Sequence, residues 1–483
     1  MNRLRRATFS CFTFSFIALL AACSSDDPSP AAATAPAVPE PDLVILGGVM
    51  LDMVADQPEP RPLKALLVRD GKIERIIAAD SAEAVPTATN TIDAGSSFIL
   101  PGFFDAHVHF RPFLPDARIW KRASNFYGIT SLFDTGPCGG RCVESGQDPN
   151  EWIKAYKDLM NSSAVTDGPT LFMTGRRIQS LDGTHPLGMK FSTRAEVSDY
   201  LDSLVELGVD GVKVEASLSA ELRAIVVDEA NARNLPVVGH SRDAYESIAA
   251  GMKFIEHMWP ITSSIVDGDP GKKKLNSPQD DHLMDLEKAP ALVQSLVDNG
   301  IYVNPTMMGR YGFFADSMKG QAEIDSKAME SGGLFADMRQ ADKDGVRKWW
   351  ARPDGLDAEQ IRLYQKSLEN VSAFLRLFSE AGGKILVATD SGEDKLIGMG
   401  LHREMKMLGI AGITPYRILL GATRWPAEMT YKNDSIGTIE EGKRADFVLL
   451  GSDPTADISN TLDIQYVIKS GTILRGATET PGT

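Results

Sequence analysis

The middle of the sequence alternates short apolar runs with stretches of helical periodicity, and this alternation restricts the fold more than any other feature. Eight runs typical of buried strands lie between residues 102 and 432, and helical patterns fit between them, for example over 194–207 and 220–231. Eight strands each followed by a helix predict an α/β fold, a (β/α)8 TIM barrel with insertions. A doubly wound open sheet is the alternative, but no Gly-x-Gly-x-x-Gly motif follows the first run. The runs cover residues 103–110, 129–135, 170–174, 211–215, 236–240, 254–258, 302–305 and 385–390.

Both ends of the sequence are rich in strand-like runs. A chain of 483 residues is too long for one simple core, so two or three domains are expected. Residues 42–100 contain short strands separated by turns, and residues 434–476 contain a second such stretch. We expect the two stretches to form one small discontinuous β-sandwich domain, which leaves residues 101–433 for the barrel.

The N-terminus has the pattern of an export signal. Three arginines precede a short apolar segment that ends in Leu20-Ala21-Ala22-Cys23, and this segment is too short to span a bilayer as a permanent helix. It resembles the lipobox of bacterial lipoproteins, which implies removal of the signal peptide 1–23 and a lipid anchor at Cys23. The expected location is therefore the periplasm or the cell surface, anchored to a membrane. Residues 24–41 lack an apolar face and predict a flexible linker.

The charge and cysteine content limit the expected partners and chemistry. The chain has 65 acidic and 50 basic residues, a net charge of −15, which argues against binding to nucleic acid or to an anionic membrane surface. Of the four cysteines, two belong to the signal region. The other two, Cys138 and Cys142, could close a small disulfide in an oxidising compartment, with metal binding as the alternative.

Residues able to bind metal ions fall at the C-terminal ends of the predicted strands, where barrel enzymes place their catalytic groups. His107 and His109 end the first run, and alternate residues of a strand share one face. Side chains suited to metal binding recur in the later runs, which makes chance an unsatisfactory explanation. They are Lys213 in the fourth run, His240 in the fifth, His257 in the sixth and Asp390 in the eighth.

The sequence as a whole resembles the amidohydrolase superfamily, and within it the imidazolonepropionase-like and prolidase-like hydrolases, the latter including Xaa-Pro and Xaa-Arg dipeptidases. The resemblance extends from residue 42 to residue 476. The family pattern has Arg-Asp near the second strand, whereas this chain has Phe133-Asp134, which leaves the role of Asp134 open. The motifs that carry the resemblance are residues 101–109, His240, residues 255–257, Asp390, and the tail segments 422–428 and 437–446.

The resemblance implies two divalent metal ions, commonly Zn²⁺. Lys213 would bridge them as a carbamate formed with CO2, because an ammonium group cannot ligate a cation. If Lys213 is unmodified, the site would hold one metal and His257 would contact substrate or water. Glu215 shares a strand face with Lys213 and is a weaker candidate. The more buried ion would be held by His107, His109 and Asp390, and the other by His240 and His257.

The resemblance implies hydrolysis of a carbon–nitrogen bond such as an amide, and not of an ester bond. The metal centre would make the attacking water more acidic. Asp390 would take the proton from water and pass it to the leaving nitrogen. The expected enzyme is an exported dipeptidase or N-acyl amino acid hydrolase, and a homo-oligomer is compatible with the sequence. The alternatives are a hydrolase of cyclic amides, as imidazolonepropionase is, and a metal-free binding protein on the same fold.

Further polar residues are expected to contact the small-molecule or dipeptide substrate. His185, in the loop after the third run, would donate a hydrogen bond to the substrate, with an ordinary loop histidine as the alternative. Arg242 and Tyr245 would bind a substrate carboxylate, since a guanidinium fork suits that geometry. We expect His282 and His402 not to be ligands. The long connection 308–357 is rich in aromatic residues, and its two tryptophans are expected to pack within the insertion. The alternative is a lid at the barrel mouth whose aromatic side chains line an apolar part of the pocket.

Overall fold

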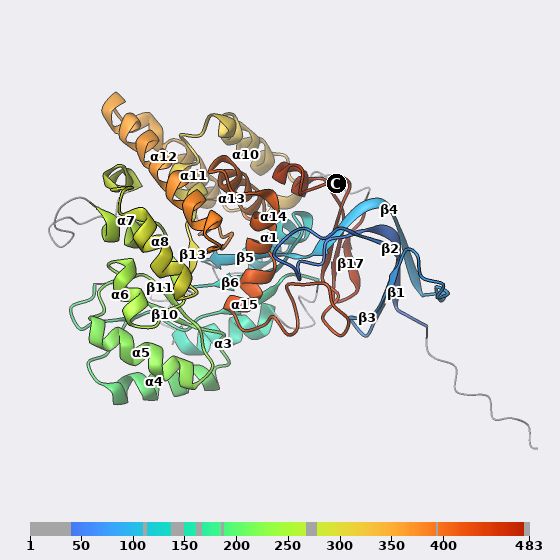
Figure 1. Ribbon diagram of the computed structural model, residues 1–483, viewed down its shortest axis with the longest axis horizontal. Coiled ribbons are helices and arrows are strands. Elements are labelled where there is room, and N and C mark those ends of the chain that lie inside the picture. The colour runs from blue at the N-terminus through green and yellow to red at the C-terminus, as the bar shows by residue number, and fades with distance from the viewer. Residues whose placement is uncertain are drawn as a thin grey trace, which may run out of the picture. The chain divides into compact units, whose positions relative to one another are not determined.

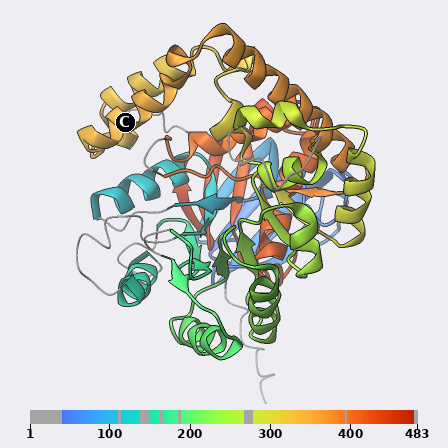
Figure 2. The same ribbon diagram turned by 90° about the vertical axis from the view of Figure 1, so that its left-hand side faces the viewer.

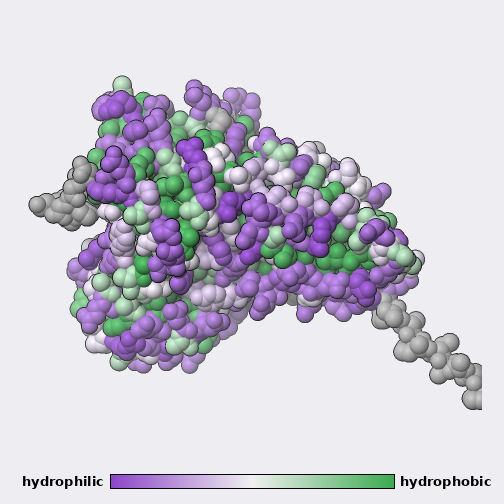
Figure 3. Space-filling view, viewed as in Figure 1, coloured by the Kyte–Doolittle hydropathy of each residue, from purple (hydrophilic) through white to green (hydrophobic). Residues whose placement is uncertain are grey.

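The computed structural model describes residues 40–109, 114–136, 149–160, 167–184, 188–266, 278–392 and 395–477, and these belong to one compact unit. The predicted signal peptide with Cys23, most of the predicted linker, the cysteine pair Cys138 and Cys142, and His185 lie outside the described residues. Among the residues that the structure does describe, no helix is both long and apolar enough to cross a membrane. Hydrophilic residues cover most of the face seen in Figure 3.

The two ends of the chain meet in one seven-stranded sheet, whose strands lie together in Figure 1. The strand order is β17-β16-β15-β4-β1-β2-β3. The long strand β4 joins the two ends, because it pairs in parallel with β1 and antiparallel with β15. The bounds are β1 Leu43–Met50, β2 Arg61–Arg69, β3 Lys72–Ala78, β4 Asn90–Pro101, β15 Phe447–Leu450, β16 Ile464–Lys469 and β17 Thr472–Arg475.

Apolar side chains cover both faces of this sheet. Alternation along a strand sends Leu43 and Ile45 to one face and Val44 to the other, and all three are buried. The first face carries the larger cluster, in which residues of the C-terminal strands such as Phe447 pack against residues of the N-terminal ones. The two chain ends therefore join, as predicted, in a single hydrogen-bonded sheet. The described residues of the two ends do not form the two facing sheets of the predicted sandwich. The domain boundaries stay a prediction.

The middle of the chain contains three parallel sheets whose strands alternate with helices (Figure 2). Two isolated parallel bridges link them: Thr174 pairs with Gly211, and Val108 pairs with Ser391. In the described part of the chain, no backbone hydrogen bond joins β11 to β12, so the ladder is not continuous around a ring. The sheets are β5-β6-β7 (Phe103–Val108, Ile129–Asp134, Thr170–Met173), β11-β10-β8-β9 (Val237–Gly239, Val212–Val214, Ile178–Gln179, Met189–Lys190) and β12-β13-β14 (Phe254–Glu256, Tyr302–Asn304, Lys384–Ile385).

Some of the helices begin at residues whose side chains cap them. Helix α4 starts after Thr193, which forms a reciprocal capping box with Glu196, and α12 starts after Asp357 in the same way with Gln360. The two helices expected from periodicity in the sequence, α4 and α5, are present. The bounds are α1 Leu114–Phe126, α3 Pro149–Met160, α4 Arg194–Glu206, α5 Ala220–Ala232, α6 Ala244–Ala249, α7 Trp259–Ile265, α8 Ala289–Asp298, α9 Met307–Tyr311, α10 Gln321–Glu330, α11 Gln340–Trp350, α12 Ala358–Glu380, α13 Met399–Ile410, α14 Pro415–Gly421 and α15 Arg424–Met429.

The long insertion between β13 and α12 packs its tryptophans inward, as the sequence predicts. The Trp349 ring lies 4.4 Å from the ring of Phe313, centroid to centroid, and Trp349 is buried. Trp350 donates a hydrogen bond from Nε1 to Asp325 at 2.7 Å, and Asp325 also accepts from Arg403 of α13. The insertion is therefore anchored to the rest of the fold by both apolar and charged contacts.

The paired strands β16 and β17 allow a matched test of the seven-stranded sheet. Ile468 is fully buried and faces Ile473, which is 40% exposed, across the strand pair. Replacing Ile468 with Ala should lower the free energy of unfolding by about 3 kcal/mol, whereas Ile473→Ala should lower it by less than about 1 kcal/mol. Urea unfolding followed by circular dichroism measures both. Equal losses would show that the C-terminal strands do not contribute a core.

Candidate metal centre

The centre is built where the end of β5 meets the segment that follows β14. The Asp390 N–H donates to the His107 carbonyl at 2.9 Å, and the His109 N–H donates to the Ser391 carbonyl at 2.8 Å. Below them, the buried Asp105 carboxylate accepts from the Thr389 N–H at 3.0 Å and from the Thr389 hydroxyl at 2.7 Å. These bonds hold two strand ends side by side although they are far apart in the sequence.

Three potential ligand atoms converge at this point. The Nε2 atoms of His107 and His109 lie 3.2 Å apart, and Asp390 Oδ1 lies 3.1 Å from His109 Nε2 and 3.5 Å from His107 Nε2. Two imidazole nitrogens and a carboxylate oxygen are ligands that a divalent ion such as Zn²⁺ prefers. The arrangement of these three side chains therefore fits a metal ion.

Glu256, at the end of β12, fixes the orientation of His107. Its carboxylate accepts a hydrogen bond from His107 Nδ1 and a second, at 2.8 Å, from the Asn304 side-chain amide. Burial would raise the pKa of Glu256, but its contacts with His107 and Lys213 outweigh burial and hold that pKa below its usual value. An ionised carboxylate on Nδ1 leaves the lone pair of His107 on Nε2, the atom that faces Asp390. Glu256 and His257 also form, with His107, a second group of potential ligands.

His257 lies beside His107, and His240 lies beside His257; both histidines have their Nδ1 engaged. Their ring centroids are 5.2 Å apart, and that of His257 is 5.4 Å from His107. His240 Nδ1 donates to Glu215 at 2.8 Å, and His257 Nδ1 is paired with the Thr306 hydroxyl at 2.7 Å. Glu215 thus orients a histidine in the same way as Glu256 does.

Lys213 is fully buried in the same cluster, and its Nζ has no hydrogen-bond partner among the described residues. Burial lowers the pKa of this amine, although the charges of Glu256, Glu215 and Asp390 act in the opposite direction. A buried ammonium without a partner is costly, so the neutral amine is favoured. The unsatisfied nitrogen indicates that a further group belongs at this position.

The backbone is strained at three positions of the centre. His257, Thr306 and Asp390 have positive φ angles of 64°, 47° and 50°, which are unfavourable for side chains other than that of glycine. Such strain is retained where the surrounding contacts over-determine the conformation, and it is concentrated at functional sites. At His257 the turn lets two successive residues, Glu256 and His257, both face the same cluster.

The structure thus brings together all six residues that the sequence places in the centre, and it adds Glu256, Asn304 and Thr306. The two other candidates that are described lie at the surface: the Arg242 side chain donates to the Ala216 carbonyl at 3.3 Å, and Tyr245 is 45% exposed. Asp134 is buried and accepts from the Gly136 N–H at 3.0 Å. His402 contacts Thr461 and the Tyr127 carbonyl, which fits its expected structural role.

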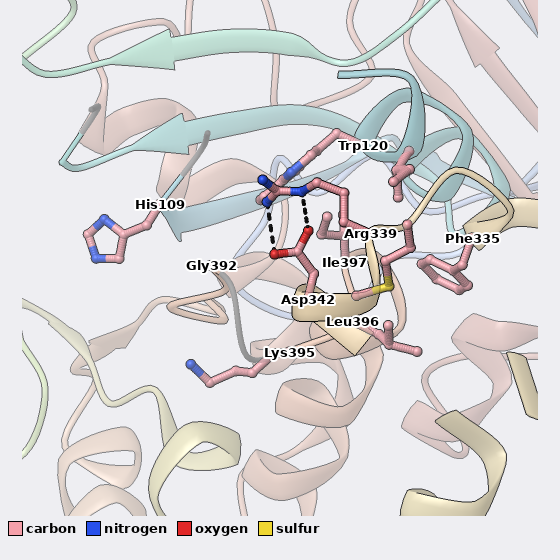
Figure 4. Close-up of a pocket in the computed structure, with 11 residues that line it drawn as sticks. His109, Trp120, Phe335, Arg339, Asp342, Gly392, Lys395, Leu396 and Ile397 are labelled. Atoms are coloured by element: carbon pink, nitrogen blue, oxygen red, sulfur yellow. Dashed lines mark hydrogen bonds and ion pairs between the residues drawn. The ribbon is translucent and has the colours of Figure 1, made fainter. Parts of the chain in front are cut away.

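A hollow of about 450 Å³ lies beside His109 (Figure 4). Its wall combines apolar side chains of α1 and the insertion, such as Trp120 and Phe335, with Lys395 and an ion pair between Arg339 and Asp342. The Lys395 ammonium donates to the Asp390 carbonyl at 2.7 Å. The candidate metal centre therefore contributes His109 to the wall of an open hollow.

Comparison with known proteins gives one family match and several similar folds. The model of the amidohydrolase family matches residues 210–474, a range that contains Lys213, His240, His257 and Asp390. No curated protein is similar enough in sequence to count as a match.

Three solved structures illustrate the shared fold. A Xaa-Pro dipeptidase with methionine in its active site is 20% identical, with a TM-score of 0.59, and the match covers 89% of this chain and 99% of that one. A prolidase complexed with N-methylphosphonate-L-proline is 19% identical, with a TM-score of 0.58 and coverage of 89% and 98%. A bottromycin amidohydrolase is 18% identical, with a TM-score of 0.63 and coverage of 90% and 87%.

The first test of the centre is removal of one ligand. His107→Asn should lose most of the divalent metal that the unmodified protein retains after dialysis against Zn²⁺, because His107 contributes to both groups of potential ligands. The control is His282→Asn, which changes a histidine of the 3-10 helix Pro278–Leu283 and should leave the metal content unchanged. Elemental analysis by mass spectrometry measures both, and equal metal content would contradict the assignment.

The second test uses pH. Burial lowers the pKa of His107 to about 4, and burial also lowers those of His240 and His257. At about pH 5 His107 is still neutral, whereas a histidine with the ordinary pKa of about 6.5 would be mostly protonated and unable to bind a cation. We expect bound metal to be retained on dialysis at about pH 5.5 and lost as the pH falls further. Release centred near pH 6.5 would argue against buried histidine ligands.

Proposed function

Because the chain belongs to the amidohydrolase family, we propose that it is an exported, metal-dependent hydrolase of amide bonds that acts on dipeptides or N-acyl amino acids. The observation that carries this proposal is the convergence of His107, His109 and Asp390 beside a buried lysine without a partner. Binding groups of this kind serve hydrolysis by activated water.

A (β/α)8 barrel is the architecture that best accounts for the positions of these residues. All six lie near or beyond the C-terminal ends of parallel strands, where barrels carry their active sites. The two bridges that connect the parallel sheets support the same arrangement. A barrel closed through β11 and β12 would complete the ring.

Two divalent ions, most simply Zn²⁺, fit the donor set. His107, His109 and Asp390 would hold one ion, and His240 and His257 the other. Ions bound there would act as Lewis acids that make water more acidic and polarise the substrate carbonyl. The partners of the Nδ1 atoms, Glu256 among them, hold the imidazole rings in position for this role.

Lys213 would connect the two ions as a carbamate. Its neutral amine attacks CO2, a carbon–nitrogen bond forms, and one proton leaves to solvent, which gives an anionic carboxylate on the lysine nitrogen. The depressed pKa favours the neutral amine that this step needs. The carbamate would supply anionic oxygens to the centre. Without it, Asp390 would be the only anionic group among the proposed ligands, because the histidines are neutral.

Asp390 is positioned to move the proton during hydrolysis. Burial would raise its pKa, but the charge of Lys395 and a hydrogen bond with His109 outweigh burial and hold the pKa well below its usual value. The carboxylate is thus ionised at neutral pH and can accept a proton from water at Oδ1, then donate it to the leaving nitrogen. The backbone bond from Asp390 to His107 keeps Oδ1 aimed into the centre.

Two further parts of the proposal rest on the sequence. The lipobox-like segment ending at Cys23 supports export and a lipid anchor. His185, Arg242 and Tyr245 follow the strands that carry the centre and remain candidates for substrate contacts. The similar structures named above include a Xaa-Pro dipeptidase and a prolidase, which supports small peptides or N-acyl amino acids as substrates.

The role of Asp390 is tested by an isosteric change. Asp390→Asn removes the proton acceptor while keeping an oxygen at the same position. The turnover number for a dipeptide that the unmodified protein hydrolyses should therefore fall by about 10²–10⁴-fold. Much of the bound metal should remain, as measured on the same samples. The control is Asp354→Asn, at an exposed position of the insertion. Turnover close to normal in Asp390→Asn would refute its role as proton carrier.

The carbamate has a direct spectroscopic test. Protein prepared with ¹³C-labelled bicarbonate and divalent metal should show a carbamate carbon signal by NMR. Lys213→Met should lack the signal, because a thioether cannot react with CO2. A signal of equal intensity in both proteins would show that the carbamate forms on another residue. The absence of a signal from both would show that Lys213 is unmodified.

A further inference from the structure

Arg310 is half-buried, and one nitrogen of its guanidinium has no hydrogen-bond partner among the described residues. It lies in α9, directly after the C-terminal end of β13. Its Nη1 atom is buried and has no hydrogen-bond partner, and no ion pair links its guanidinium to an acidic residue in the described part of the chain. A buried nitrogen of a charged group without a partner is costly, so the position of Nη1 calls for an explanation.

The neighbouring acidic residue does not supply that partner. Asp281 is buried, and its two carboxylate oxygens accept hydrogen bonds from the Thr262 and Tyr311 hydroxyls. The charge of Arg310 lowers the pKa of Asp281, which burial raises, so the two groups sense each other. They nevertheless do not form an ion pair. The capacity of Arg310 to bind an anion is therefore unused within the described chain.

Arg310 lines a hollow of about 710 Å³ between α9 and the start of α12. A second arginine, Arg352, lines the same hollow, and none of the described residues in its wall is acidic. Its aromatic wall includes Phe314 and Tyr364, whose rings stack with centroids 4.6 Å apart and planes 11° from parallel. A positively charged hollow with aromatic walls is notable in a chain of net charge −15, and it suits a molecule with an anionic group and an apolar body.

Helix α9 contributes to the wall of this hollow, and the residue before the helix contacts the candidate metal centre. The residue before this helix, Thr306, holds His257 at 2.7 Å, and Arg310 follows one helical turn later. Gly309, which also lines the hollow, lies against the Lys395 side chain, and Lys395 in turn donates to the Asp390 carbonyl at 2.7 Å. A substrate with its amide at the centre could thus reach Arg310 with its other end.

We infer that Arg310 binds the free carboxylate of the substrate, and that the preferred substrates are N-acyl or N-aminoacyl derivatives of an apolar α-amino acid whose side chain rests against the aromatic wall. The inference rests on the proposed amide hydrolysis and assigns its specificity. A guanidinium fork binds a carboxylate through two parallel hydrogen bonds. Arg310 is then a specificity-determining residue, and Arg242, the candidate from sequence, lies on another loop with its side chain donating to a backbone carbonyl.

The experiment compares two probes that differ only in charge, N-acetyl-L-phenylalanine and its C-terminal carboxamide, on the metal-loaded full chain. The variants are Arg310→Met, Arg242→Met and the control Arg347→Met, which removes an arginine of α11 that pairs with Asp344 at the surface. Acetate release gives kcat and KM. Calorimetric titration on the Asp390→Asn background gives affinity without turnover.

Arg310→Met should raise KM and Kd for the acid at least about tenfold and change those for the carboxamide by less than about twofold, because only the acid loses a charged hydrogen bond. Its melting temperature should not fall, since the guanidinium has no partner to lose. Arg347→Met should match the unmodified protein for both probes.

The outcomes separate this inference from the proposed function. If the unmodified protein prefers the acid over the carboxamide in titrations and Arg310→Met abolishes the preference, Arg310 is the carboxylate site even when no acetate is released, and the proposed hydrolysis is what fails. If the protein hydrolyses the acid and Arg310→Met does so equally well, the inference is wrong. The inference would also be overturned if only Arg242→Met selectively lost affinity for the acid. The carboxylate would then be bound by the loop after β11.

Discussion

The pairing of the end of β5 with residues 389–391 is the interaction on which the rest of the centre depends. It brings His107 and His109 to Asp390 through backbone hydrogen bonds, and the Asp105 carboxylate locks the two strand ends together from below by accepting two bonds from Thr389. Burial raises the pKa of Asp105 to about 7, so this lock places an ionisable group where water cannot solvate it. Because the hydrogen bonds are local and directional, a small shift of either strand would separate the three ligand atoms.

The cluster above this lock shows how a protein keeps several ionisable groups buried together. Glu256 and Glu215 each bind the Nδ1 atom of one histidine, so each negative charge has a partner, and each histidine presents its other nitrogen to the centre. Lys213 and Arg310 do not follow this rule. Both hold a nitrogen that is buried and unsatisfied, Lys213 inside the centre and Arg310 beside it. The proposals made above place another molecule at each of these two nitrogens.

Much of this arrangement follows from the sequence, and the exceptions have physical causes. Alternation along a strand and the common end of parallel strands suffice to select the six residues of the centre. Glu256 escapes such reasoning because neighbours on a regular strand face opposite ways, and only the positive φ of His257 lets both face inward. Arg310 could not be found either, because its significance is the absence of a partner, which depends on tertiary contacts. Closure of the barrel likewise depends on strand register, which short apolar runs do not specify.

The position of β15 in the seven-stranded sheet has a consequence for how the protein is made. β4 is translated early, but its second neighbour, β15, leaves the ribosome only after the whole middle of the chain. Until then one edge of β4 is open, and an open edge is a template for pairing with other chains. A nascent or prematurely terminated polypeptide therefore exposes an unpaired strand edge. This edge is a structural signal by which chaperones and proteases can tell unfinished molecules from complete ones.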